Sequence, residues 1–267
     1  MPRTLVLSPR YTRDSIALRD AALEAGWAVE RLQSWRAPEY LLGRDVVPYG
    51  EPLFAAVIAD VLQIALIEAR LSWVAELPAD LRRRELEFTN LAAARAIRWR
   101  TFIKPADDKC FRAQVYNSGA QLPANDVLVG TTPVLVSEPV SWEIEFRCFV
   151  VEQEVTTLSV YSRQGELAEA EDGSWPASAS ESNEALTFAS DVLQDPRVNF
   201  PPAGVLDVGR IQDRGWAVVE ANACWGSGIY GCDPCRVLRT LSRACVKRSE
   251  ITDVDRQWVV DRASTAI

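Results

Sequence analysis

Hydrophobic residues in the first third of the chain recur with the spacing of a strand, a helix and a second strand. The apolar run 4–7 is short enough for a buried strand, and residues 15–25 carry apolar side chains at helical spacing up to Gly26. Residues 27–32 alternate between apolar and polar, as a half-buried strand does. This order predicts a small parallel sheet, to which residues 45–48 add a candidate strand.

Helical patterns follow up to about residue 96. Pro52 suits the first turn of a helix, and the apolar spacing predicts a buried helix over 54–67. A second helical stretch over 79–96 carries the basic run 82–84, which consists of three arginines. We expect this run to form a solvated helix face, with contact to a substrate as the alternative.

The pattern changes at Arg98, where short strands and turns replace the helical spacing. Strands are predicted over 99–104, 114–116, 133–137, 144–151 and 155–161. A surface loop rich in Glu, Ser and Ala is predicted over 165–183, a short helix over 184–193 and a last amphipathic helix over 237–245. Between these two helices, residues 206–231 predict two short strands joined by a turn.

The composition matters mainly for what it excludes. The formal net charge of −8 argues against a general nucleic-acid or membrane-surface binder, because phosphate binding requires a surplus of Lys and Arg. The chain contains no histidine, which excludes a Ser-His-Asp triad and every His-ligated metal site. No apolar run approaches the roughly 20 residues of a membrane helix, and the first residues show no export signal. We therefore expect a cytoplasmic protein with reduced cysteines and no membrane partner.

The predicted hairpin over 206–231 carries a candidate metal site. Asp207 lies on its first strand, and Glu220 and Asn222 lie on its second. Because side chains two positions apart on a strand share a face, Glu220 and Asn222 point the same way. Two carboxylates and an amide oxygen are hard ligands of the kind that Mg²⁺ accepts.

Further polar residues follow the predicted strands before this hairpin. Lys104 ends one strand and Lys109 lies in the next loop, so the two offer ammonium groups to phosphate oxygens. The strand end 137–140 leaves at a proline and offers backbone groups to an adenine ring. Glu145 and Arg147 share one strand face, which presents a hydroxyl acceptor and a bidentate phosphate ligand.

This series resembles the ATP-grasp superfamily. The resemblance rests on FIKPADDK, SEPV, EFRCF and LDVG…VVEAN in that order, over roughly residues 98–233. It is strongest to the small peptide-tagging clade whose name stands for two arginines and a lysine. More distantly the chain is similar to tubulin-tyrosine-ligase-like enzymes, in which the metal ligands follow the spacing D-x12-E-x-N that Asp207, Glu220 and Asn222 reproduce.

The resemblance implies an α+β ATP-grasp fold, in which two subdomains clasp ATP. Residues 98–267 would form the ATP-grasp domain, and residues 1–97 a small α/β domain that precedes it. Within the ATP-grasp domain, residues 98–140 would form the N-terminal subdomain with the phosphate loop, and residues 141–267 the C-terminal subdomain with the metal site.

The resemblance also implies roles for single residues. Lys104 would contact the α-phosphate of ATP and Lys109 the β- or γ-phosphate. Glu138 and Val140 would border the adenine, and Glu145 would accept hydrogen bonds from the ribose hydroxyls.

Three arginines are implied in the chemistry itself. Arg147 would stabilise the transferring phosphoryl group. Arg163 and Arg210 are alternative candidates for a second arginine on phosphate or on a substrate carboxylate. Asp207, Glu220 and Asn222 would hold Mg²⁺ on the ATP phosphates.

The implied reaction is an ADP-forming ligation. A small-molecule or peptide carboxylate would attack the γ-phosphate to give an acyl phosphate, and an amine would then displace phosphate. Electrostatic stabilisation by Mg²⁺ and cationic side chains needs no histidine. The alternatives are a phosphotransferase that stops at phosphoryl transfer to a hydroxyl, and a non-catalytic nucleotide-binding module.

The segment after the hairpin leaves two questions open. Cys224, Cys232, Cys235 and Cys245 either bind zinc as four thiolates or are ordinary buried thiols. The glycine-rich loop either lines a substrate cavity or simply packs its aromatic residues. The cavity alternative involves Trp225, Ser227, Gly228, Tyr230 and Asp233.

Overall fold

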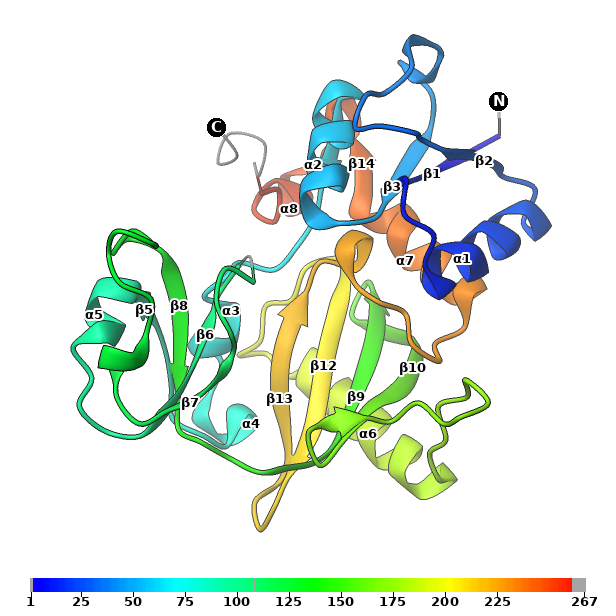
Figure 1. Cartoon of the computed structure of the whole chain (residues 1–267). Helices are drawn as coiled ribbons and strands as arrows, with labels where there is room; N and C mark the ends of the chain where they lie inside the picture. The colour runs from blue at the N-terminus through cyan, green and yellow to red at the C-terminus, as the bar shows by residue number, and fades with distance from the viewer. Residues whose placement is uncertain (1, 108, 261–267) are drawn as a thin grey trace.

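The N-terminal part of the chain folds around a parallel three-stranded sheet. The computed structural model, drawn in Figure 1, describes residues 2–107 and 109–260. The sheet has the order β2-β1-β3, with β1 at Thr4–Leu7, β2 at Ala28–Arg31 and β3 at Val46–Tyr49. Helix α1 (Arg13–Glu24) connects β1 to β2, and Thr12 caps it by accepting a hydrogen bond from the backbone N–H of Ser15. The predicted strand–helix–strand unit is confirmed.

The helix predicted over 54–67 is wrong in its second half. Helix α2 ends at residue 61 (Pro52–Val61), and Gln63 adopts a left-handed conformation with φ of 57°. The chain then enters β4 (Ile64–Leu66), which pairs antiparallel with β14 (Cys245–Lys247). The apolar run is buried in both settings, so hydrophobicity alone could not separate the helix from the strand. This pairing forms a separate two-stranded sheet, which joins the C-terminal part of the chain to the N-terminal part.

A four-stranded antiparallel sheet forms a second unit, with the order β5-β8-β6-β7. Its strands are β5 (Leu86–Asn90), β6 (Thr101–Pro105), β7 (Gln114–Tyr116) and β8 (Pro133–Ser137). The short helices α3 (Trp73–Glu76) and α4 (Ala79–Arg82) precede β5, and α5 (Leu91–Arg95) follows it. The 3₁₀ turns η1 (Glu39–Leu41) and η2 (Gly119–Gln121) lie in connecting segments.

The single helix predicted over 79–96 is therefore wrong. Arg83 has a left-handed backbone with φ of 47°, which ends α4. Leu86 and Phe88 alternate with polar residues, and this period of two belongs to a strand. Asn90 then caps α5 by accepting a hydrogen bond from the N–H of Ala93 at 2.9 Å. Because β5 lies before Arg98, the four-stranded sheet takes one strand from the predicted first domain. The division at 97/98 stays a prediction.

The third unit is a five-stranded antiparallel sheet with the order β11-β10-β9-β12-β13. Its strands are β9 (Trp142–Val151), β10 (Glu154–Arg163), β11 (Glu166–Leu167), β12 (Ala203–Ile211) and β13 (Gly215–Asn222). Helix α6 (Ala179–Gln194) packs on one face of this sheet (Figure 1). A capping box of Ser178 and Glu181 starts the helix earlier than predicted, so the predicted loop 165–183 is shorter.

The C-terminal segment begins at the turn η3 (Cys224–Gly226) and continues into α7 (Pro234–Ala244). The predicted last amphipathic helix corresponds to α7, which Asp233 caps by accepting hydrogen bonds from the N–H groups of Cys235 and Arg236. The turn η4 (Arg248–Glu250) and the short helix α8 (Asp253–Arg256) follow. No helix among the described residues is long and apolar enough to cross a membrane.

Two separate hydrophobic cores hold these units together. The larger core joins the N-terminal sheet, the five-stranded sheet and their helices, and it includes Leu135 of β8; Phe54, Phe146 and Trp225 are among its largest buried side chains. The smaller core belongs to the four-stranded sheet and consists of Leu91, Ala94, Ile103, Tyr116, Leu122 and Val134. The α+β class is confirmed, with the four-stranded sheet packed as a unit beside the larger body.

Candidate functional site

A cavity of about 300 Å³ lies where the four-stranded and five-stranded sheets face each other. Its walls include Lys104 from β6, Glu145 from β9 and Glu220 from β13. Glu138 and Val140, in the connection between β8 and β9, form part of its border. Apolar side chains such as Leu86, Phe102 and Leu135 cover the side of the four-stranded sheet. The structure therefore brings together five of the residues that the sequence nominated.

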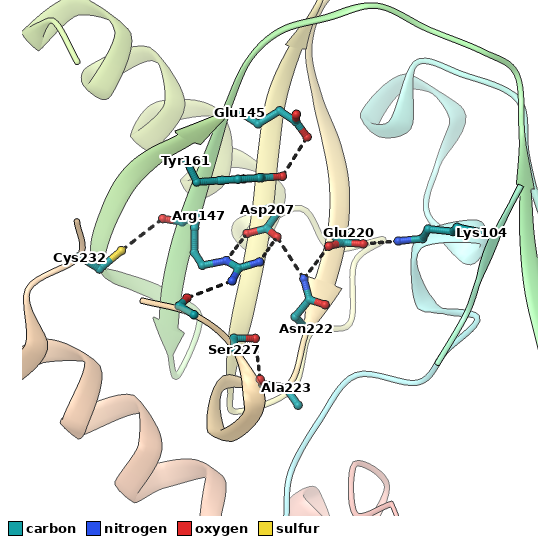
Figure 2. Close-up of polar contacts among 11 residues, drawn as sticks. Lys104, Glu145, Arg147, Tyr161, Asp207, Glu220, Asn222, Ala223, Ser227 and Cys232 are labelled. Atoms are coloured by element: carbon teal, nitrogen blue, oxygen red, sulfur yellow. Dashed lines mark hydrogen bonds and ion pairs between the residues drawn. The ribbon is translucent and has the colours of Figure 1, made fainter. Parts of the chain in front are cut away.

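A continuous chain of polar contacts adjoins the cavity (Figure 2), and its members Lys104 and Glu220 line the cavity wall. The guanidinium of Arg147 donates two hydrogen bonds to Asp207, from Nε at 3.0 Å and from Nη2 at 2.7 Å. The amide nitrogen of Asn222 donates to Asp207 at 3.0 Å and to Glu220 at 2.9 Å. Glu220 also forms an ion pair with Lys104. Two carboxylates, an amide and two cations thus converge on one point.

Burial sets the electrostatics of this chain. The Asp207 side chain is fully buried and that of Arg147 is only 8% exposed. Burial raises the pKa of Asp207, and the charge of Arg147 opposes that rise. For Glu220, burial acts in the same direction, but the Lys104 ammonium and the Asn222 amide outweigh it and lower the pKa to about 2. Each acid is therefore matched by a cation from a different strand.

The donor set fits Mg²⁺. Asp207 and Glu220 lie directly opposite each other in the β12–β13 ladder, and Asn222 follows Glu220 on the same face. Carboxylate and amide oxygens are ligands that Mg²⁺ accepts. Side-chain amide orientations are assigned from hydrogen bonding, so Asn222 can present either its oxygen or its nitrogen to this point. The three predicted ligands are brought together, and their role in binding metal stays a prediction.

The zinc alternative for the cysteines is wrong. The four cysteines of this alternative, Cys224, Cys232, Cys235 and Cys245, lie in the part of the chain that the structure describes, and each is a free thiol. No three Cys, Asp or Glu side chains among the described residues lie close enough to hold a metal ion. Burial raises the pKa of Cys232 to about 12, which keeps this thiol protonated and unreactive. Cys224, Cys232 and Cys245 are buried and follow the buried-thiol alternative, whereas Cys235 is exposed and does not.

Two tyrosines that surround Arg147 complete the site. The guanidinium carbon of Arg147 lies 5.5 Å from the ring centroid of Tyr161 and 4.9 Å from that of Tyr230. The Tyr161 hydroxyl also donates to Glu145 at 2.8 Å. Burial raises the pKa of Glu145, and the hydrogen bonds from Ser162 and Tyr161 oppose that rise. The sequence analysis missed Tyr161, although its position on the strand that pairs with β9 was a usable signal.

The loop after β13 contacts the site through its own backbone. The Gly228 carbonyl accepts from Arg147 Nη1 at 3.0 Å. Asp14, in the first turn of α1, accepts from the N–H of Ile229 at 3.0 Å, and the sequence analysis did not identify this contact. Trp225 is fully buried and donates to the carbonyl of Ile67 at 3.2 Å, so it belongs to the core rather than to a cavity wall.

Three other nominated residues lie outside the cavity. Lys109 is exposed in the loop after β6. Arg163 pairs with Glu181 at the start of α6, and Arg210 pairs with Glu143. Neither arginine contributes to the cavity wall, and the structure does not choose between them as phosphate ligands.

Arg84 corrects the prediction of a solvated helix face over 82–84. This arginine is 8% exposed, and it forms part of the cavity wall. Its guanidinium lies 5.0 Å from the ring centroid of Trp142. Arg83 next to it does reach the solvent. Consecutive arginines gave no sequence signal for which one turns inward, because that choice depends on the left-handed turn at Arg83.

Comparison with known proteins agrees with the fold. The matching family model describes an ATP-grasp domain, the second family of the clade named for two arginines and a lysine, and it covers residues 81–240. No protein with a curated function matches the chain.

Several solved structures share the fold at low sequence identity. D-cycloserine synthetase DcsG is 16% identical with a TM-score of 0.56, and the match covers 90% of this chain and 98% of that one. N5-carboxyaminoimidazole synthetase from Staphylococcus aureus is 10% identical with a TM-score of 0.54, covering 92% and 78%. D-alanine–D-alanine ligase from Bacillus anthracis is 10% identical with a TM-score of 0.51, covering 91% and 97%. These similarities show an ATP-grasp fold, and because the family model matches more than half of the sequence, the chain belongs to this second family of the two-arginine-and-lysine clade of ATP-grasp domains.

Proposed function

We propose that this protein is an ATP-dependent, ADP-forming carboxylate–amine ligase that acts through an acyl phosphate. The observation that carries the proposal is the convergence of Asp207, Glu220 and Asn222 beside Lys104 and Arg147 at one end of the cavity. Several proteins with the same fold are named as ligases or synthetases, including an L-amino acid ligase from Bacillus licheniformis. The fold alone fits other reactions, so the proposal rests on the site.

The cavity would hold the nucleotide between its two walls. The apolar side chains of Phe102 and Leu135 would pack on the adenine, and the chain from Glu138 to Val140 would run along its edge. Glu145 would accept from the ribose hydroxyls, oriented by the hydroxyl of Tyr161. Lys104 lies at the end where Glu220 stands, so its ammonium can pass from that carboxylate to a phosphate oxygen. Lys109 would reach the outer phosphates from its exposed loop.

Mg²⁺, when bound, would neutralise negative charge on the phosphate oxygens. Asp207, Glu220 and Asn222 are the residues that would hold it. Arg147, fixed by Asp207 and by two aromatic rings, would present its remaining guanidinium N–H groups to the phosphoryl group in transfer. Its position is set before any substrate arrives, so little reorganisation would be needed during the reaction.

The chemistry would proceed in two balanced steps. A carboxylate oxygen of the first substrate would attack the γ-phosphorus, the bond to the β-phosphate oxygen would break, and ADP would leave. The amine of the second substrate would then attack the acyl carbon, and inorganic phosphate would leave with the bonding electron pair. The amine loses a proton in that step. The substrates would be a small-molecule or peptide carboxylate and an amine.

The test is product analysis with ATP, Mg²⁺ and pairs of amino acids. We expect ADP and free phosphate to appear only when both a carboxylate and an amine are present, together with an amide product detected by mass spectrometry. Glu220→Gln should abolish turnover, whereas Arg197→Met, which removes an arginine paired with Asp80 and Asp195 on the surface, should not. Phosphate retained on an organic product would instead indicate a kinase. Failure of the wild type to hydrolyse or transfer from ATP under all these conditions would refute an enzymatic role.

A further inference from the structure

The ladder between β12 and β13 contains a bulge directly before the proposed metal ligands. From the turn of this hairpin up to the pair Val208–Val218, each residue faces one partner. The next pair is Asp207–Glu220, so Val219 is an extra residue on β13. A bulge of this kind leaves one residue out of the pairing and changes which face the following side chains occupy.

The bulge decides which side chains meet Asp207. With uninterrupted pairing, Val219 would lie opposite Asp207, because a shift of one residue moves every side chain to the other face. Glu220 and Asn222 would then share the face of Val218, which is fully buried in the larger core. Two polar side chains would enter the core, and no second carboxylate would stand beside Asp207. The three proposed ligands converge only because Val219 is extra.

Arg84 binds the backbone of this bulge. Its Nη1 donates to the Val218 carbonyl at 2.7 Å, and its Nη2 donates to the Val219 carbonyl at 2.8 Å. The fork of the guanidinium matches two adjacent carbonyls that point the same way, which regular pairing does not provide. Trp142 stacks on the other side of this guanidinium and lies against Gly209, where an added Cβ would approach the ring to within 2.8 Å.

The position of β13 explains why such a contact is needed. β13 is the edge strand of its sheet, on the side that faces the four-stranded sheet (Figure 1). A bulge on an edge leaves backbone carbonyls without a ladder partner, and buried carbonyls require one. Burial lowers the pKa of Arg84 to about 10, so the guanidinium stays charged at neutral pH. Because its Nη groups donate to backbone carbonyls, Arg84 forms no ion pair with the described carboxylates of the site.

We propose that Arg84 is a positioning residue, which holds the bulge at Val219 and thereby places Glu220 and Asn222 beside Asp207 for binding the metal–nucleotide complex. The proposal rests on the proposed function of this site. Arg84 acts through the backbone of β13, in the way that residues behind a metal site orient its ligands. It also ties the segment before β5 to the five-stranded sheet, so that the two walls of the cavity meet at the bulge.

The experiment measures ADP binding by calorimetry, with and without Mg²⁺, for the wild type and for Arg84→Met. We expect the wild type to bind ADP more tightly when Mg²⁺ is present. In Arg84→Met the Mg²⁺ concentration that gives half of this enhancement should rise by about 10-fold or more. Affinity for ADP without Mg²⁺ should change much less than the Mg²⁺ requirement, because Arg84 borders the cavity but donates its hydrogen bonds to the β13 backbone.

Two companion variants make the result specific. Arg83→Met removes the neighbouring arginine, which donates to the carbonyl of Arg214 in the turn of the same hairpin, and should leave the Mg²⁺ dependence unchanged. Arg84→Lys keeps the positive charge but loses the forked pair of guanidinium donors. Its Mg²⁺ requirement should lie between those of the wild type and Arg84→Met. Should Arg84→Met fail to fold by circular dichroism, Arg84→Lys carries the test alone.

Three outcomes would overturn the inference. An unchanged Mg²⁺ dependence in Arg84→Met would show that the bulge holds without this arginine. A loss of ADP affinity that is equal with and without Mg²⁺ would show that Arg84 contacts the nucleotide directly. If ADP binding by the wild type does not depend on Mg²⁺, the proposed metal site is refuted, and the role of Arg84 with it. Failure of the metal site can therefore be distinguished from failure of the role of Arg84 alone.

Discussion

The two walls of the cavity differ in the side chains that they present and in the hydrophobic core behind them. The wall formed by the five-stranded sheet belongs to the larger core and carries buried, mutually paired charges, such as Arg147 with Asp207. The wall formed by the four-stranded sheet has its own small core and offers the cavity mainly apolar side chains. Under the proposed function, the first wall would hold the reacting groups in a fixed geometry, and the second would provide a surface suited to a flat aromatic ring.

The contacts between these walls include several polar ones. Lys104 pairs with Glu220, Arg214 pairs with Glu138, and Arg84 binds the backbone of β13. Two cores joined by such contacts can shift relative to each other at lower cost than one continuous core, because less apolar surface is exposed. The residues of the site therefore need not be equally rigid. Four sets of variants test this contrast, in order of decreasing effect.

Removing Arg147 should destabilise the protein more than removing a surface arginine. Arg147→Met leaves the carboxylate of Asp207 buried without its partner, which costs about 3–5 kcal/mol of unfolding free energy. Arg163→Met removes a partly exposed ion pair with Glu181 and should cost only about 0–1 kcal/mol. Urea denaturation of both variants measures the difference. Equal losses of unfolding free energy in the two variants would mean that the buried pair of Arg147 and Asp207 stabilises the protein no more than a partly exposed pair.

The smaller core should respond separately from the larger one. Ile103→Ala removes a fully buried side chain of the four-stranded sheet and should cost about 2–5 kcal/mol locally. Hydrogen exchange should then rise in β5, β6 and β8 while β9 and β12 stay protected. Phe146→Ala, in the larger core, serves as the counterpart and should raise exchange in the five-stranded sheet. Uniform loss of protection in both variants would show a single cooperative unit.

Tyr161 contacts both Glu145, in the cavity wall, and Arg147. Tyr161→Phe removes its hydrogen bond to Glu145 and keeps the ring against the guanidinium. We expect ADP affinity to weaken by about 0.5–1.5 kcal/mol, with stability of the Arg147–Asp207 pair preserved. Calorimetric titration checks the first effect and denaturation the second. An unchanged ADP affinity would remove Glu145 from the proposed ribose contact.

The ion pair between the walls should give a small effect that depends on pH. Lys104 and Asn222 hold the pKa of Glu220 at about 2, below its ordinary value of 4.5. A carboxyl group whose pKa is lowered by folding stabilises the folded state at pH values above its ordinary pKa. This contribution is lost as the pH falls from 4.5 toward 2. The stability difference between the wild type and Glu220→Gln should therefore be no more than about 1 kcal/mol at about pH 6 and shrink at about pH 3. Urea denaturation across this range checks it, and a difference that grows on acidification would contradict the assigned pairing.

The sequence predicted much of the fold because its signals are local. Strands β8 and β12 and the hairpin that carries Asp207 and Glu220 follow from alternation and turn residues. Spacing also placed Glu145 beside Arg147 on one strand face. The helix predicted over 79–96 failed because β5 is a short edge strand whose pairing with β8 is not visible locally.

The sequence could not predict features that depend on a one-residue shift in strand pairing or on contacts between residues far apart in the chain. The bulge at Val219 shifts the ladder by one residue, and the run Val218–Val219–Glu220 gives no sign of it. Arg84 turns inward because of the turn at Arg83, and its partners lie far later in the chain, on β13. Arg163 and Arg210 were nominated through the resemblance, as alternatives for a second arginine, and the structure places both in other ion pairs.

Under the proposed function, Asp207, Glu220 and Asn222 hold a divalent cation together with the nucleotide. Mn²⁺ is a paramagnetic substitute for Mg²⁺, and the electron paramagnetic resonance signal of free Mn²⁺ reports how much is bound. Because ADP alone also binds Mn²⁺, ADP without protein is the baseline. The wild type should lower the free Mn²⁺ signal below this baseline and Glu220→Gln should not, although both proteins bind ADP alone. Equal removal of Mn²⁺ by the two proteins would contradict the claim.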